Sequence, residues 1–164
     1  MKIPKDRKAP FGVFAKTVEY YPMVSVNIIL KNEKDEFLWI KRKNNPTKGE
    51  WWVPGGRIFN GETIEAGAKA VLEKETGIKG EIFYISPQYF EEIFSTAEWS
   101  NEDRHFYPFS VENVHYIGTA IVMKIENSEA VKLDEQSVEY KWSKEILSDH
   151  PYLKNYFKAC QEYL

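Results

Sequence analysis

The stretch that decides the fold is VPGGRIFNGETIEAGAKAVLEKETGI, residues 53–78. Its second half predicts a helix over residues 63–76. At about 100° per residue, one sector of that helix collects apolar side chains, namely Ile64, Ala68, Val71 and Leu72. Gly77 follows directly, in the position where a left-handed residue usually closes a helix. Glu75 breaks the pattern, because it projects into the apolar sector.

Glu75 therefore needs a positive partner if it is buried. Burial of an unpaired carboxylate costs on the order of several kcal/mol, and the helix dipole adds about 0.3–1 kcal/mol at the last turn. One candidate partner is a basic side chain, Arg42 or Arg57. Another is a divalent cation such as Mg²⁺, which takes a few protein oxygens and completes its shell with water and phosphate. The alternative is a frayed helix end with Glu75 in water, and periodicity alone leaves these readings open.

The loop before the helix makes the pattern more specific. It places a glycine pair before Arg57, five residues between Gly56 and Glu62, and twelve residues between Glu62 and Glu75. Residues 55–78 resemble the Nudix box, the loop–helix–loop by which Nudix hydrolases hold magnesium against a diphosphate. The resemblance implies an α+β fold, an α/β/α sandwich with a mixed sheet, a central Nudix helix and a C-terminal helix.

The box departs from the general family pattern on its helix. Ala70 and Val71 stand at the usual Arg-Glu pair, and Lys74 precedes Glu75 at the usual Glu-Glu pair. The GDP-mannose mannosyl hydrolase subgroup also keeps VPGGR, the following ET and only the last glutamate. Similarity to it extends over roughly residues 14–78 and 114–142. It implies release of a sugar and a nucleoside diphosphate by attack at the anomeric carbon. The alternatives are a Nudix pyrophosphatase and a non-catalytic nucleotide-sugar-binding domain.

The same resemblance implies roles for individual residues. Gly55, Glu75 and Gln136 match the ligands of Mg²⁺, for which Mn²⁺ is a possible substitute. Arg57 matches the arginine that stabilises the departing nucleoside diphosphate. Three further positions match substrate contacts: Arg42, the phosphate-contacting Tyr116, and Phe14 near the base.

The general base of the subgroup is missing. A histidine follows DEQ in the subgroup, whereas this chain has Ser137, and Asn27 replaces an aspartate of the first strand. A serine of ordinary pKa accepts no proton at neutral pH, and base catalysis is worth about 10²–10⁴-fold. Candidate replacements are His105, the neighbouring pair Glu91 and Glu92 and, as a weaker choice, His115.

The remaining chain predicts one domain, residues 1–164, with strands at 23–30, 37–43, 81–85, 114–125 and 139–142 and a last helix within 150–164. Residues 1–22 form an arm with one short strand or helical turn, and residues 91–113 form a long loop or insertion. Cys160, the single cysteine, is expected in the core.

Composition and charge indicate the class of partner and the location of the protein. The net charge is −3 and no dense Lys/Arg run occurs, which speaks against nucleic acid and anionic membranes as partners. No signal or membrane-spanning segment is found, so a cytoplasmic location is expected. A homodimer and a small-molecule nucleotide-sugar or nucleoside diphosphate substrate follow from the resemblance.

Overall fold

The computed structural model describes residues 3–4, 7–102, 104, 107–108, 110–126 and 131–164. Its helices are α1 (Phe11–Tyr20), α2 (Ile64–Thr76), α3 (Pro151–Ala159) and a short 3₁₀ helix (Gln161–Tyr163). Its strands are β1 (Met23–Lys31), β2 (Phe37–Arg42), β3 (Trp51–Trp52), β4 (Gly55–Arg57), β5 (Glu81–Ser95), β6 (Asn113–Lys124) and β7 (Ser137–Ser143).

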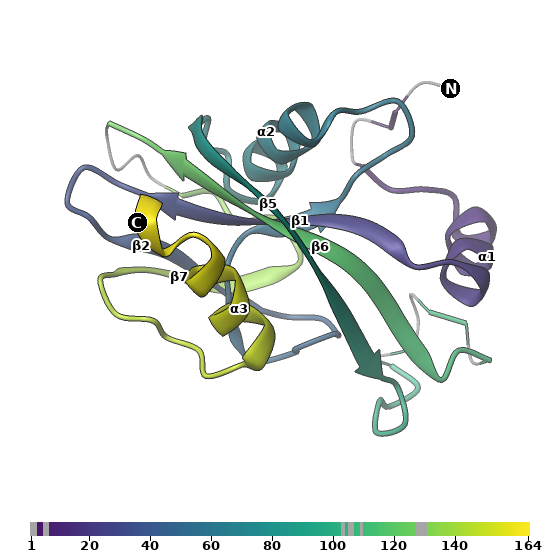
Figure 1. The fold of residues 1–164 in the computed structure, drawn as a ribbon. Coiled ribbons are helices and arrows are strands. Elements are labelled where there is room, and N and C mark those ends of the chain that lie inside the picture. Colours follow the sequence, from purple (N-terminus) through teal and green to yellow (C-terminus); the bar gives the residue numbers. More distant parts are fainter. Residues whose placement is uncertain (1–2, 5–6, 103, 105–106, 109, 127–130) are drawn as a thin grey trace.

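The strands form one mixed sheet. Its order is β3-β2-β1-β6-β5, with β4 paired to β1 and β7 paired to β2. β1 runs parallel to β6 and antiparallel to β2 and β4. Helices α2 and α3 lie on opposite faces of this sheet (Figure 1). The predicted α+β architecture with two flanking helices is confirmed.

Each flanking helix closes its own core. Under α2 the core contains Leu72, whereas under α3 the rings of Trp39 and Phe157 stack 5.5 Å apart. Cys160 lies in the α3 core, as predicted, and burial raises the pKa of its thiol to about 11. The sheet is therefore sandwiched, and only its ends are available for a site.

The predicted central helix is confirmed to within one residue at its start. Thr63 caps it, because its hydroxyl accepts a hydrogen bond from the Ala66 amide at 3.1 Å. Gly77 ends it with φ of 71°, a left-handed conformation that favours glycine. These two caps hold α2 at a defined length and so place its last turn.

The N-terminal arm is more ordered than predicted. Instead of one short strand or helical turn, it contains the ten-residue helix α1. The sequence lacks a clear helical stripe there, since Phe11 and Val13 are exposed and Val18 is the buried residue. Val18 packs with Tyr107 of the segment between β5 and β6, so tertiary contact positions this helix.

The prediction of a long loop at 91–113 is wrong for its first part. Residues 91–95 continue β5 and pair with β6 as far as Ser95 opposite Asn113. Two adjacent acids, Glu91 and Glu92, made the strand hard to predict. Glu91 is exposed and Glu92 is buried, so the alternation of a strand is present without an alternation of residue type. A buried carboxylate mimics a loop residue when burial is judged from composition alone.

The arm is fastened to the glycine loop by a buried ion pair. The Arg7 guanidinium donates to both Glu62 carboxylate oxygens, at 2.5 and 2.9 Å, and both side chains are 8% exposed. Arg7 also donates to the Arg57 carbonyl at 2.8 Å. The pair lowers the pKa of Glu62. These bonds hold the segment before α1 against the loop before α2.

In the part of the chain that the structure describes, no helix is both long and apolar enough to cross a membrane.

Candidate active site

A cavity of about 760 Å³, called the main cavity here, lies where β1, β4, the end of α2 and the start of β7 meet. All the predicted metal-binding and substrate-binding residues line it: Phe14, Arg42, Gly55, Arg57, Glu75, Tyr116 and Gln136. The predicted residue His105 lies outside the described residues. One cavity thus collects residues from widely separated parts of the sequence.

The glycine pair lies against strand β1 and helix α2. Gly55 pairs with Asn27 and Gly56 with Val26 in an antiparallel ladder. A Cβ at Gly55 would lie 3.0 Å from the Asn27 Oδ1, and one at Gly56 would lie 3.1 Å from a methyl of Val71. The tight approach of loop, strand and helix therefore needs glycine at both positions.

Glu75 points into the main cavity, as its place in the helix predicted. It is 5% exposed, and the Gly55 amide donates to its Oε2 at 2.9 Å. Burial raises the pKa of its carboxyl to about 7, against the lowering effects of Arg42 and of the Gly55 amide. The frayed helix end is excluded, and the nearby basic side chain is Arg42.

Gln136 lies in a turn that is hydrogen-bonded to the last turn of α2. The Asp134 amide donates to the Glu75 carbonyl at 3.1 Å, and Lys74 pairs with the Asp134 carboxylate at 2.9 Å. That carboxylate accepts from the Gln136 backbone amide at 2.9 Å and from its Nε2 at 3.2 Å. Because the amide nitrogen is engaged, the side-chain oxygen of Gln136 is the group left for a ligand.

The lining of the main cavity includes oxygen atoms of the kind that bind magnesium. Among the described residues no group of three or more His, Cys, Asp or Glu side chains is arranged to hold a metal. The donors at hand are the Glu75 carboxylate, the Gln136 amide oxygen and the Gly55 carbonyl. Such a set suits Mg²⁺, which usually takes one or two carboxylates and completes its shell with water and phosphate.

Arg42 is the cation at the centre of the site. Its Nε donates to the Pro46 carbonyl at 3.0 Å, which fixes the guanidinium at the end of β2. Burial raises the pKa of Glu75, of Glu92 and of Tyr116, and the charge of Arg42 opposes the rise in all three. One arginine therefore faces two buried carboxyls and a phenol.

Arg57, the second arginine of the predicted site, also lines the main cavity and packs on an aromatic ring. Its guanidinium carbon is 4.4 Å from the centroid of Phe14, a cation–π contact. Phe14 meets the edge of Tyr107 at 5.5 Å, and Tyr107 shares a 3.3 Å hydrogen bond with the Tyr116 hydroxyl. In this structure Phe14 orients Arg57, a role that the sequence did not suggest.

The candidates for the missing base are separated by the fold. Ser137 pairs with Arg42 across β7 and β2 and is not among the described residues that line the main cavity. Glu91 is exposed and faces His115, with 3.8 Å between its Oε1 and the imidazole Nε2. Glu92 alone of this pair lines the main cavity.

Glu92 is a buried carboxyl held by a side chain of α3 on the same face of the sheet. It is 4% exposed, and the Tyr156 hydroxyl of α3 donates to its Oε1 at 2.7 Å. That hydroxyl fits against β6 because Gly118 has no side chain; a Cβ there would lie 2.1 Å from it. Burial raises the pKa of Glu92 to about 7, while Tyr156 and Arg42 oppose the rise.

Sequence reasoning missed Arg7, Trp52 and Tyr156. Trp52 donates from its indole to the Asn27 Oδ1 at 3.1 Å and lines the main cavity. Tyr156 is a buried residue of α3, where the sequence predicts only a helix. Arg7 alone carried a usable signal, as one of four arginines in the chain.

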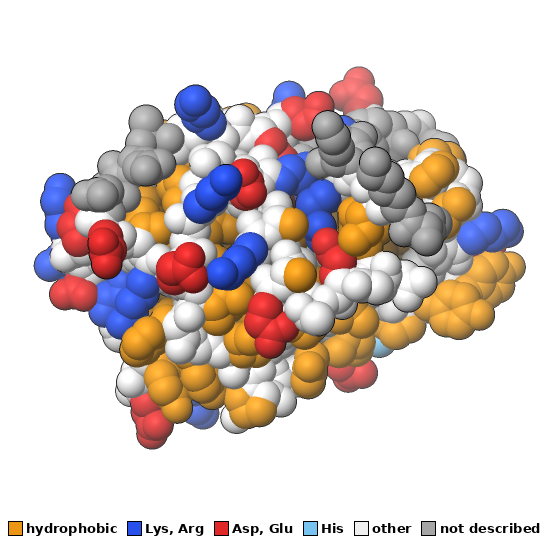
Figure 2. Space-filling view, turned by 90° about the horizontal axis from the view of Figure 1, so that it is seen from above, with side chains coloured by type: hydrophobic (Ala, Val, Ile, Leu, Met, Phe, Trp, Pro, Cys, Tyr) orange, Lys and Arg blue, Asp and Glu red, His pale blue; other side chains and the backbone are white. Residues whose placement is uncertain are grey.

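The surface above α2 carries charges of both signs. Figure 2 shows basic and acidic side chains interspersed on this face, with hydrophobic side chains between them. On the described part of this face the charges do not form one broad basic surface. The arginines of the main cavity are thus a local concentration of positive charge.

Three comparisons place the chain among known proteins. The family model for the NUDIX domain matches residues 21–146. The low-salt glycan biosynthesis protein Agl8 of Haloferax volcanii is 29% identical over 93% of this chain and 90% of its own length. An ADP-ribose pyrophosphatase of Methanocaldococcus jannaschii is 41% identical over 58 residues, 35% of this chain and 34% of that protein.

A solved structure with a similar fold is also found. The crystal structure of the MutT protein from Methanosarcina mazei superposes with a TM-score of 0.60 and 24% identity, covering 86% of this chain and 94% of that one. The family model covers most of the chain, and the glycine loop and capped helix have the geometry described above. The chain therefore belongs to the Nudix hydrolase family.

Proposed function

We propose that this protein is a magnesium-dependent hydrolase of nucleotide sugars, which separates the sugar from the nucleoside diphosphate. The observation that carries the proposal is the pairing of a single carboxylate on α2, Glu75, with a second buried carboxyl, Glu92, around Arg42 in one cavity. A full-length relative named for glycan biosynthesis supports a sugar-containing substrate.

The diphosphate binds between the two arginines. Arg42 and Arg57 both line the main cavity, and a planar guanidinium group matches phosphate oxygens in two places at once. Tyr116 donates its hydroxyl, whose raised pKa keeps it protonated. Nudix hydrolases generally use a divalent metal. Gly55, Glu75 and Gln136 would hold it in this chain, and the metal would supply positive charge for the diphosphate.

Glu92 removes the proton from the attacking water. Its Oε1 accepts a hydrogen bond from the Tyr156 hydroxyl, so Oε2 is the carboxylate oxygen that accepts the proton of the water. The water oxygen bonds to the anomeric carbon as the bond from that carbon to the phosphate oxygen breaks. The nucleoside diphosphate leaves with the bonding electrons, and Arg42 and Arg57 hold its charge.

A pyrophosphatase is the second candidate. The local similarity to an ADP-ribose pyrophosphatase favours it, since that protein's name specifies cleavage of a diphosphate. In this case the same arginines bind the substrate, but water attacks phosphorus. The two candidates differ in which bond breaks, and so they can be separated by the products.

The first prediction concerns that bond. In ¹⁸O water, a panel of nucleotide sugars that includes GDP-mannose and UDP-glucose should give label in the free sugar and none in phosphate. Mass spectrometry of the sugar and phosphorus NMR of the nucleotide make the measurement. Label in phosphate would establish the pyrophosphatase, and binding without any turnover would establish a non-catalytic domain.

The second prediction concerns the metal. Mg²⁺ at about ten times its dissociation constant should stabilise the protein by about 1.4 kcal/mol, roughly 3–6 °C in Tm for a chain of this size. The variant Glu75→Gln can still accept from the Gly55 amide and should fold, yet it should lose most of this rise. Glu73→Gln, an exposed position on the same helix, is the matched control. An equal rise in both variants would contradict the proposed metal site.

The third prediction concerns proton transfer. Because the ionised carboxylate is the active form, kcat/KM should rise with pH through about 7 and then level off. Glu92→Gln should lower kcat by about 10²–10⁴-fold and abolish this limb. Tyr156→Phe removes a hydrogen bond that lowers the pKa of Glu92, so it should shift the limb to higher pH. An unchanged limb in both variants would rule Glu92 out as the base.

The fourth prediction concerns assembly. We propose a homodimer through α1 and the start of β1, where apolar side chains are between 45% and 69% exposed: Phe11, Val13, Tyr20, Tyr21 and Val24. Sedimentation equilibrium should give twice the chain mass of 19.2 kDa. The double variant Val13→Glu/Tyr20→Glu should sediment as a monomer, whereas Tyr89→Glu, an exposed position on β5, should not. A monomeric wild-type protein would refute this interface.

A further inference from the structure

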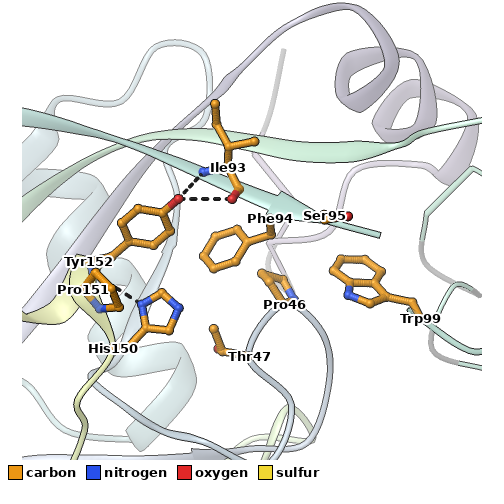
Figure 3. Close-up of a pocket in the computed structure, with 9 residues that line it drawn as sticks. All are labelled: Pro46, Thr47, Ile93, Phe94, Ser95, Trp99, His150, Pro151 and Tyr152. Atoms are coloured by element: carbon orange, nitrogen blue, oxygen red, sulfur yellow. Dashed lines mark hydrogen bonds between the residues drawn. The ribbon is translucent and has the colours of Figure 1, made fainter. Parts of the chain in front are cut away.

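A second hollow, called the side pocket here, adjoins the main cavity (Figure 3). Its volume is about 450 Å³, within the range of small-molecule sites. It lies between the loop after β2, the end of β5 and the start of α3. Pro46, Thr47 and Phe94 line both hollows, so a ligand in the main cavity can extend into the side pocket.

The walls of the side pocket are aromatic. Phe94 stands between the pair His150 and Tyr152 on one side and Trp99 on the other (Figure 3). The rings of Phe94 and Tyr152 meet edge to face at 5.3 Å. The Tyr152 hydroxyl accepts from the Ile93 amide at 2.9 Å and donates to the Ile93 carbonyl at 3.1 Å. These bonds fix the aromatic surface before any ligand binds.

The side pocket is also uncharged. None of the described residues that line it is Asp, Glu, Lys or Arg. Burial lowers the pKa of His150, with Glu50 opposing, so its imidazole is neutral at pH 7. Its Nδ1 accepts from the Tyr152 amide at 3.3 Å, where it caps α3, and the proton of the neutral ring is therefore on Nε2. The pocket offers aromatic faces and a neutral donor.

These walls suit a neutral ring with both carbon–hydrogen faces and hydroxyl groups. A phosphate would find no cation here. A nucleobase could stack on the same rings, but the position of the pocket disfavours it. Phe94 follows Glu92 by two residues on the same face of β5, about 7 Å along the strand. In a nucleotide sugar, the sugar is bonded directly to the diphosphate, whereas ribose and two phosphates separate the base from the reacting carbon.

We propose that the side pocket is the subsite for the sugar ring, which packs against Phe94 and Trp99 and accepts a hydrogen bond from His150 Nε2. This inference rests on the proposed function and adds the place of the sugar to it. Phe94 lines both hollows, so a ring packed on it keeps its anomeric carbon at the junction with the main cavity, on the side of Glu92 and Arg42.

The test compares ligands with and without the sugar. GDP-mannose and GDP form one pair of probes, and UDP-glucose and UDP form another. The KM of the nucleotide sugar and the inhibition constant of the nucleoside diphosphate are measured in the same assay with Mg²⁺. The variants are Trp99→Ala and His150→Asn; asparagine can still cap α3, so the second variant removes the donor while keeping the helix start. Tyr89→Ala, an exposed aromatic on β5 outside both hollows, is the control.

Both variants should raise the KM of the nucleotide sugar about five- to tenfold, the size expected for truncating a well-packed contact. The inhibition constant of the nucleoside diphosphate should change less than twofold, and Tyr89→Ala should change neither. A parallel rise in both constants would overturn the inference, because the pocket would then hold the base or support the fold. If Trp99→Ala does not fold, since Trp99 also packs on Tyr107, His150→Asn decides alone.

Failure of the proposed function can be distinguished from failure of the sugar subsite. If the wild-type protein neither binds nor cleaves any nucleotide sugar, both proposals fall. If it cleaves nucleotide sugars and the variants leave the KM unchanged, the sugar subsite alone is refuted.

Discussion

The hydrogen bond from the Gly55 amide to the Glu75 carboxylate is the constraint on which the site depends. It joins the two ends of the loop–helix segment at a carboxyl whose pKa burial raises to about 7, although the hydrogen bond itself opposes that rise. The approach is possible because neither Gly55 nor Gly56 has a side chain to hold β1 and α2 apart. The turn that carries Gln136 then attaches to the same helix end through Asp134.

The electrostatics of the cavity follow from that burial. Glu75 and Glu92 both titrate near neutrality because water is excluded from them, and Arg42 is the cation that opposes the shift in each. A buried carboxyl is costly unless a positive charge approaches it. A cavity of this kind gains free energy when a metal ion and a phosphate enter together, since their charges satisfy the carboxylates and the arginines at once.

The two faces of the sheet cooperate in the site. Helix α2 supplies Glu75 from one face, while α3 supplies the Tyr156 hydroxyl on the other, in the space that Gly118 leaves free. The start of α3 also forms the wall of the side pocket with His150 and Tyr152. A C-terminal helix that reads as plain core packing therefore shapes both the carboxyl proposed as base and the space proposed for the sugar.

The sequence by itself determined the central helix, its caps, the glycine loop and the place of Glu75 in the apolar sector, because these depend on interactions within about 25 residues. The structure was needed to exclude the frayed helix end. Local periodicity is enough to show a carboxylate on an apolar face. Only the tertiary structure decided between Glu91 and Glu92, gave Phe14 its contact with Arg57 and brought Tyr156 to the site. The physical reason is that burial, and the pKa it sets, depends on which strands and helices pack together. For Glu92 that meant a strand pairing and a helix 64 residues away along the chain.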